Sequence, residues 1–182
     1  MSRSFRGGLS ALTMSIVALL PAATVAAPLS AASRVGPPGI GPIHFGMTPA
    51  QAAATGATLT MLSGAPVPSG ETGCYFVRAK GLNDVEFMVE GGTLRRADVD
   101  SREIRTTDGF RVGDAAAAIE RFYGSRASVN PDKYDPAVQE IEVVPTGPSA
   151  AKYRMIFRIK KGAVFQIRAG ALPQVQYVER CG

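Results

Sequence analysis

The chain contains an internal repeat, which restricts its possible folds more than its composition does. A short apolar run ends at Gly46 and is followed by an alanine-rich stretch, and the same pattern returns at Gly113, 67 residues later. Downstream, residues 87–94 align with residues 157–164, so this second match is 70 residues apart. In each of these two segments, two alternating runs are separated by a glycine-bearing turn. Two matches in the same order at nearly the same spacing predict two copies of one structural unit.

Each alanine-rich stretch carries the signals of a short helix. Thr48 is a good N-cap, Gln51 completes a capping box with it, and Gly56 is a typical stop. In the second copy Asp114 is the expected cap and Gly124 the stop. Helices of two or three turns are marginal alone, so both must pack on other elements. The second helix has an expected apolar stripe, formed by Ala115, Ala118, Ile119 and Phe122.

Two predicted hairpins supply a sheet on which these helices can pack. A further strand is expected before each hairpin, at residues 74–78 and 138–144, together with strands at 43–45 and 110–112 before the helices and a last strand at 175–178. Loops rich in Gly, Pro and Ser are expected at residues 63–73, 130–137 and 145–149. Alternation along the hairpins assigns one face to the core, with the residues Val85, Phe87, Val89, Ala97, Val99, Met155, Phe157, Ile159, Phe165 and Ile167.

The expected fold class is therefore α+β, built from two tandem repeats. Each repeat is a short helix packed on an antiparallel sheet of about three to four strands. The predicted divisions are a signal peptide, a flexible N-terminal segment, a first repeat and a second repeat, at residues 1–26, 27–38, 39–103 and 104–182.

Residues 1–26 have the layout of a cleavable secretory signal peptide. Arg3 and Arg6 precede an uncharged apolar run at residues 9–25, and small residues follow it. A second possible cleavage position lies after Ala32. The apolar run is short against the ~20 residues that a membrane-spanning helix needs, and no cysteine follows it for lipidation. We expect a bacterial protein that is periplasmic or secreted, with no membrane span after signal cleavage.

Cys74 and Cys181 are the only cysteines. In an exported chain this even count predicts one disulfide bond. In the chain-entropy model, a disulfide that closes so long a loop stabilises the folded protein by up to ~4.7 kcal/mol. The alternative is a pair of buried free thiols or a redox pair, but the Cys-x-x-Cys spacing of redox pairs is absent.

Nucleic acid is not an expected partner. Cleavage of the signal peptide removes Arg3 and Arg6 and lowers the formal net charge from +5 to +3. The remaining charges alternate in sign, whereas nucleic-acid binding needs a clustered basic patch. We expect a monomer that meets a protein or an envelope polymer instead.

The sequence nominates no catalytic residue, metal site or cofactor. The single histidine, His44, has no placed partner, and serine-hydrolase motifs are absent. A zinc site would need several His or Cys ligands. An enzyme using a carboxylate pair stays open as an alternative, since acidic residues surround the first hairpin, namely Glu86, Glu90, Asp98, Asp100 and Glu103.

The sheet face opposite the predicted core is the candidate binding surface. Its candidate contacts are Arg158, Lys160, Gln166, Arg168 and Met88, with Tyr134 in a nearby loop as a further contact. These residues have a simpler interpretation as solvent-facing strand residues and a loop anchor.

At residues 46–56 and 113–124, the chain resembles two related groups, the beta-lactamase inhibitory protein family and the small outer-membrane assembly lipoproteins. Its ending at residues 178–181 also looks like that of other exported bacterial proteins with this layout. The resemblance implies a non-catalytic protein that acts through a sheet surface, and it transfers no binding residues. The chain lacks the cysteine of the lipoproteins. We therefore expect an exported binding or inhibitory module acting on a protein or an envelope or glycan partner, with a cell-envelope hydrolase as the alternative.

Overall fold

The structure is a computed structural model that describes residues 27–68, 70 and 73–181. The predicted signal peptide at residues 1–26 lies outside the described residues. Within the described part of the chain, no helix is long and apolar enough to cross a membrane.

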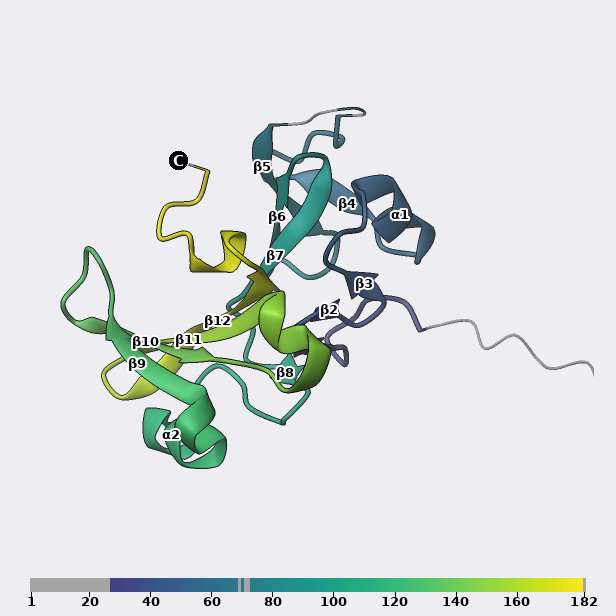
Figure 1. Cartoon of the computed structure of the whole chain (residues 1–182). Coiled ribbons are helices and arrows are strands. Elements are labelled where there is room, and N and C mark those ends of the chain that lie inside the picture. Colours follow the sequence, from purple (N-terminus) through teal and green to yellow (C-terminus); the bar gives the residue numbers. More distant parts are fainter. Residues whose placement is uncertain (1–26, 69, 71–72, 182) are drawn as a thin grey trace, which may run out of the picture.

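An antiparallel sheet of eight strands forms the body of the molecule (Figure 1). Its strands follow the spatial order β4 (Leu59–Met61), β5 (Cys74–Ala79), β6 (Val85–Glu90), β7 (Thr93–Val99), β12 (Ala163–Ala171), β11 (Tyr153–Lys160), β10 (Val138–Val143) and β9 (Ala127–Pro131). A second sheet has the order β3 (Ile43–His44), β2 (Gly39–Ile40), β1 (Arg34–Gly36) and β8 (Arg105–Thr106). The helices are α1 (Pro49–Ala54) and α2 (Ala116–Tyr123), with short 3-10 helices η1 (Gly124–Arg126), η2 (Gly147–Ala151) and η3 (Gln174–Gln176). The predicted α+β class is confirmed.

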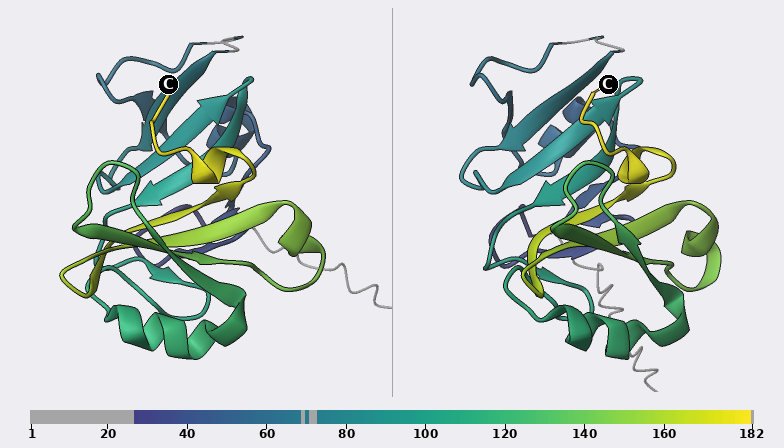
Figure 2. Two further views of the ribbon diagram at one scale, coloured as in Figure 1. Left: turned by 60° about the vertical axis from the view of Figure 1, so that its left-hand side comes forward. Right: turned by 90° about the vertical axis from the view of Figure 1, so that its left-hand side faces the viewer.

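The core lies on one face of the large sheet. Val35, Ile40 and Ile43 of the small sheet, Ala52 of α1 and Ile119 of α2 all belong to one buried cluster with the large sheet. Both helices and the small sheet therefore cover the same face. The opposite face carries the C-terminal segment, and α2 and the C-terminus lie at opposite ends of the molecule in both views of Figure 2.

The hairpin turns form as predicted. The central residues Gly91 and Gly92 both have positive φ, as do Lys161 and Gly162 in the second hairpin. Two successive positive φ angles match the right-handed twist of the flanking strands, which is why glycine is favoured there. The hairpins are β6–β7 and β11–β12.

Nine of the ten predicted core residues are buried, and Phe165 is the exception. The β11–β12 register shifts between Arg158 and Ile159, so that Phe165 has no residue opposite it. A bulge restarts the side-chain alternation. Val164 therefore faces the core, and the guanidinium carbon of Arg158 lies 5.0 Å from the centre of the Phe165 ring.

The first helix begins as predicted, with a complete capping box between Thr48 and Gln51. The predicted cap of the second helix was wrong. Its N-cap is Ala115, because the Asp114 carboxylate accepts the backbone N–H of Arg111 at 2.9 Å instead of capping the helix. The predicted stripe also fails at Phe122, which is exposed, while Tyr123 is buried in its place.

Two strand predictions need correction, and two strands of the large sheet were not predicted. Residues 175–178 form η3 and an irregular segment instead of a strand, and residues 110–112 are not a strand, since the short strand of that region is β8. The strands β4 and β9 were missed, and β9 includes the start of the loop predicted at residues 130–137. Four of the five residues of β9 are exposed, so it lacks the apolar alternation by which strands are recognised.

Candidate functional site

The face of the large sheet opposite the core carries a network of charged side chains. Asp98 accepts from Arg96 at 2.9 Å and from Arg168 at 3.2 Å, across the strands β7 and β12. These three residues are only 1%, 7% and 4% exposed, in the order Arg96, Asp98 and Arg168. Buried charges are costly unless they are paired and hydrogen-bonded, so both guanidinium groups rely on the Asp98 carboxylate, and Arg168 has a second, longer contact with Glu140 at 4.0 Å.

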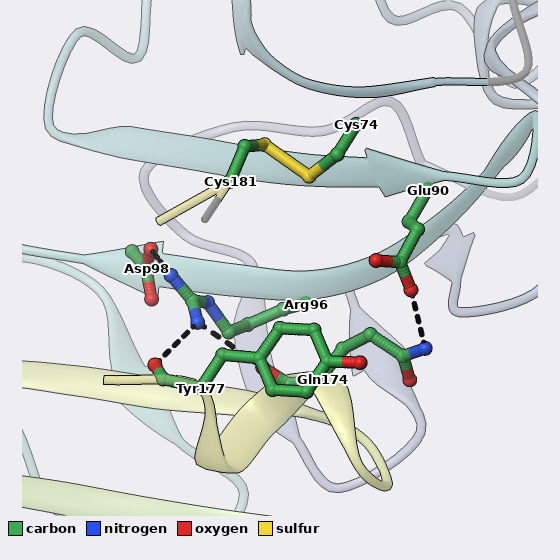
Figure 3. Close-up of a disulfide and its surroundings, with 7 residues drawn as sticks. All are labelled: Cys74, Glu90, Arg96, Asp98, Gln174, Tyr177 and Cys181. Carbon is green, nitrogen blue, oxygen red and sulfur yellow. Dashed lines mark hydrogen bonds and ion pairs between the residues drawn. A yellow bond between two sulfur atoms is a disulfide. The ribbon is translucent and has the colours of Figure 1, made fainter. Parts of the chain in front are cut away.

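Residues 172–181, here called the strap, leave the end of β12 and cross this network. Arg96 Nη1 donates to the backbone carbonyls of Gln174 and Tyr177, both at 3.1 Å (Figure 3). Arg168 Nη1 donates to the Tyr177 carbonyl at 3.2 Å. The Gln174 amide donates to Glu90 at 2.6 Å. The strap backbone therefore accepts hydrogen bonds from both guanidinium groups, while the buried Arg96 Nε has no hydrogen-bond partner among the described residues.

The predicted Cys74–Cys181 disulfide is confirmed, with a Cα–Cα distance of 5.5 Å (Figure 3). It joins the end of the strap to β5, which is consistent with an exported protein. Next to it, Arg180 donates to Glu86 at 2.5 Å, and its guanidinium carbon lies 3.9 Å from the centre of the Phe76 ring. The strap is thus held at both ends, by β12 and by the disulfide.

The connection between β9 and β10 meets the strap over the second half of the sheet. The Tyr134 hydroxyl donates to the Glu179 carboxylate, and Lys133 Nζ lies 4.9 Å from the centre of the Tyr134 ring. The Tyr134 ring is 60% exposed. We call this region the strap–loop surface and define it by the residues Lys133, Tyr134, Lys160, Val178 and Glu179, all of which are exposed.

The base of the β9–β10 connection is tied to the sheet by ion pairs. Arg158 contacts Asp132 at 2.8 Å and Glu140 at 3.2 Å, and Lys160 contacts Asp135 at 3.0 Å. Backbone N–H groups of Tyr134 and Asp135, together with Arg158, hold the pKa of Asp132 below its ordinary value. These contacts fix the position of the exposed Tyr134 ring.

The structure divides the six candidate binding residues. Tyr134 and Lys160 are exposed, and Arg158 and Gln166 are partly exposed. The Gln166 amide donates to Asp100 at 2.9 Å. Met88 and Arg168 are buried. The expectation that all six face solvent therefore fails at these two, because the strap covers the part of the face on which they lie.

Two acidic residues near the first hairpin have shifted pKa values. Burial alone would raise the pKa of Glu86, but hydrogen bonds and charges from Arg180 and Arg78 outweigh it and hold the pKa below its ordinary value. Partial burial and the nearby carboxylates of Asp98, Glu86 and Asp84 raise the pKa of Asp100, against the hydrogen bond from Gln166.

Among the described residues, no group of three or more His, Cys, Asp and Glu side chains is placed to hold a metal ion. His44 is exposed at the end of β3. No protein-family model, curated protein or solved structure matches the chain. The resemblance to the inhibitory and lipoprotein families therefore stays a prediction from residues 46–56 and 113–124.

Proposed function

We propose that this chain is an exported, non-catalytic binding or inhibitory module of the periplasm or the medium, and that it engages a protein partner through the strap–loop surface. The observation that carries the proposal is the exposed Tyr134 side chain. Its hydroxyl donates to the Glu179 carboxylate, and Lys133 Nζ lies 4.9 Å from the centre of its ring. Tyrosine is among the side chains that dominate binding energy at protein interfaces, because it offers large contact area at a low entropic cost. The disulfide supports the exported location.

The ion pairs on the sheet face opposite the core also support binding rather than acid–base chemistry. Glu86 contacts Arg78 and Arg180, and Asp98 contacts Arg96 and Arg168. The two guanidinium groups hold the pKa of Glu86 below its ordinary value, so Glu86 is a poor proton donor. Such a compensated sheet provides a rigid platform, and recognition is left to the few exposed groups above it.

We also propose that the two halves of the chain are copies of one unit. Gly46 N–H donates to Leu94 O at 2.7 Å, and Gly113 N–H donates to Val164 O at 2.8 Å. Each half runs from a helix through four strands, and the two hairpins carry bulges at Met88/Val89 and at Arg158/Ile159, positions that are 70 residues apart. This spacing equals the offset of the sequence match at the hairpins.

The proposed function is tested by capture from an envelope extract of the producing bacterium. The immobilised, processed protein should retain a partner, and Tyr134→Ala and Lys160→Glu should each weaken retention at least about tenfold. Phe122→Ala is the matched control, since Phe122 is an exposed aromatic residue on α2, at the end of the molecule away from the strap. Arg168 is left intact because its reversal would bury an unpaired charge.

Unchanged capture by both surface variants, or equal loss with Phe122→Ala, would overturn the assigned surface. Protease treatment of the extract separates the partner classes. Capture that survives proteolysis but not glycan digestion would point to an envelope polymer and contradict a protein partner.

A hydrolase with a carboxylate pair is the second candidate, and one observation favours it. Asp84 and Asp100 line a pocket of about 470 Å³, and Asp100 has the raised pKa of a proton donor. Hydrolysis of an envelope glycan that is abolished by both Asp84→Asn and Asp100→Asn, but not by Glu103→Gln, would establish this candidate instead.

A further inference from the structure

A second, smaller site lies at the other end of the molecule, near the end of α2. Four segments surround it: the turn at residues 37–38, the turn at residues 107–108, η1, and the connection at residues 145–149. Its volume is about 230 Å³. Pockets for drug-sized ligands span ~300–1,000 Å³, so this one has room for a metabolite of only a few carbon atoms.

Close packing of two turns builds one wall of this pocket. A Cβ on Gly36 would lie 2.9 Å from Thr107 Cγ2, and Thr107 N–H donates to Val35 O at 2.9 Å. Glycine at position 36 therefore allows the 107–109 turn to sit directly against β1. This contact fixes the position of Asp108, which lines the pocket.

Tyr123 organises the charged groups of the pocket. Its side chain is 4% exposed, its hydroxyl donates to Asp108 Oδ2 at 2.8 Å, and the guanidinium carbon of Arg126 lies 5.1 Å from the centre of its ring. Burial and the hydrogen bond to Asp108 raise the pKa of Tyr123, so the phenol stays protonated and remains a donor at neutral pH. One fixed tyrosine therefore positions a carboxylate at its tip and a cation over its ring.

The Asp108 carboxylate and the Arg126 guanidinium do not form an ion pair with each other. No ion pair of the described residues includes Asp108 or Arg126. The hydroxyl groups of Thr107, Thr146 and Ser149 also line the pocket. Tyr123 uses one oxygen of Asp108, which leaves the other oxygen able to accept a further bond. The pocket thus combines an anion acceptor, a cation and neutral hydroxyls in a small volume.

We propose that this pocket binds a small zwitterion of the free α-amino acid class. Its ammonium group contacts Asp108, its carboxylate contacts Arg126, and the hydroxyls of Thr146 and Ser149 complete the polar contacts. The pocket carries one negative and one positive side chain, which matches a ligand with both charges. A simple anion would be repelled by Asp108, and a simple cation would be repelled by Arg126. The inference does not rest on the proposed function, since the pocket is formed by other residues.

The experiment follows amide chemical shifts of the processed protein during titration with four probes: L-alanine, acetate, ethylamine and glucose. L-Alanine should produce saturable shifts at residues 108, 123 and 126, and acetate and ethylamine should each bind at least about tenfold more weakly. Glucose should produce none. Stronger binding of glucose or acetate than of L-alanine, or no saturation by ~100 mM L-alanine, would overturn the proposal.

Charge-neutral variants assign the two ends of the ligand. Asp108→Asn and Arg126→Gln should each weaken L-alanine binding at least about tenfold. Glu120→Gln and Arg121→Gln are the controls, since both residues are exposed on α2, and they should not weaken it. Tyr123→Phe keeps the ring but removes the hydrogen bond to Asp108, so it should weaken ethylamine and L-alanine and leave acetate unchanged. Equal weakening of all probes would indicate a merely structural role for the site.

Discussion

Asp98 is the residue on which two buried guanidinium groups depend. Its replacement by alanine would leave Arg96 without a carboxylate partner and Arg168 with only Glu140, at 4.0 Å. Removal of one member of a buried ion pair costs about 3–5 kcal/mol, because the remaining charge stays buried without compensation. We therefore expect Asp98→Ala to lower the free energy of unfolding by about this amount in urea denaturation.

The control is Glu103→Ala, at an exposed carboxylate that makes no ion pair among the described residues. It should change the free energy of unfolding by no more than about 0.5 kcal/mol. If Asp98→Ala behaved like Glu103→Ala, the strap carbonyls alone would satisfy the two arginines, and Asp98 would not be essential to the network.

The lowered pKa of Glu86 predicts how the stability of the protein depends on pH. Its pKa is lowered in the folded protein by Arg180 and Arg78, so its stabilising effect is present above the unfolded value of about 4.3 and is lost as the pH falls through the lowered pKa. We expect the free energy of unfolding to decrease below about pH 4, and to decrease less steeply in Glu86→Gln. Denaturation curves at several pH values check this, and identical slopes for both proteins would contradict it.

At this scale, alternation predicted most core positions and failed at the bulge of the second hairpin. Phe165 was placed in the core because a regular two-residue period was assumed, and the extra residue reverses that assignment. Arg168 and Met88 were placed at the surface because their strand positions are correct for that face. Their burial depends on a segment that arrives from a distant part of the chain, and local patterns contain no information about it.

The strap is the element with the least regular structure and the most specific anchoring. Cys74→Ser with Cys181→Ser would free its end while leaving the hydrogen bonds from Arg96 and Arg168. We expect faster hydrogen exchange at the amides of Gln176 and Tyr177, and a loss of global stability of up to ~4.7 kcal/mol.

The amides of α2 are the internal reference for this measurement, because α2 lies away from the strap (Figure 2). Their exchange should follow global unfolding in both proteins. If the strap amides did the same in the variant, the disulfide would act only by lowering the entropy of the unfolded chain and would not hold the strap locally.

Local signals predicted the elements that depend on local chemistry. The capping box of α1 and the glycine turns of both hairpins form as expected, because their hydrogen bonds join residues close in sequence. Residues 175–178 were predicted as a strand from their apolar and aromatic content, yet the carbonyls of Val175 and Tyr177 accept from Arg168 instead of from a neighbouring strand. Strand propensity was overridden by this tertiary contact.

For the whole molecule, the decisive contact is the junction of β7 and β12. Four residue pairs, from Ile167↔Val99 to Gly170↔Arg96, join the two halves into one sheet. Gly170 is required there, since a Cβ would lie 2.7 Å from Arg95 O and 2.9 Å from Arg96 Cα. We expect Gly170→Ala to force the strands apart and to lower the free energy of unfolding by about 1–3 kcal/mol.

Gly81→Ala is the comparison for this variant. Gly81 has a φ of +84° but nothing within 4 Å of its ideal Cβ, so its replacement measures backbone strain without crowding. It should cost about 1–2 kcal/mol in thermal or urea unfolding, from backbone strain alone. A smaller effect at Gly170 than at Gly81 would show that the junction can widen without loss.

The sequence match suggested two similar halves, but nothing in it revealed how they join. Whether two such units form separate sheets or share one depends on the edges of β7 and β12, and edge pairing leaves little trace in a single sequence. The small sheet adds a second junction, since β1 pairs with β8 from the other side of the division expected at residue 103.

The position of Cys181 also sets the order of assembly. The first half can form its hairpin early, but its strand β5 lacks the disulfide until Cys181, 107 residues further on, has been synthesised. Contacts between such distant residues form slowly, because the entropy of closing the loop must be overcome first. During this interval Cys74 is a free thiol, and Arg96 and Arg168 lack the strap carbonyls that accept their hydrogen bonds in the folded protein. The newly made chain is therefore most exposed to mispairing and aggregation just before its last ten residues arrive.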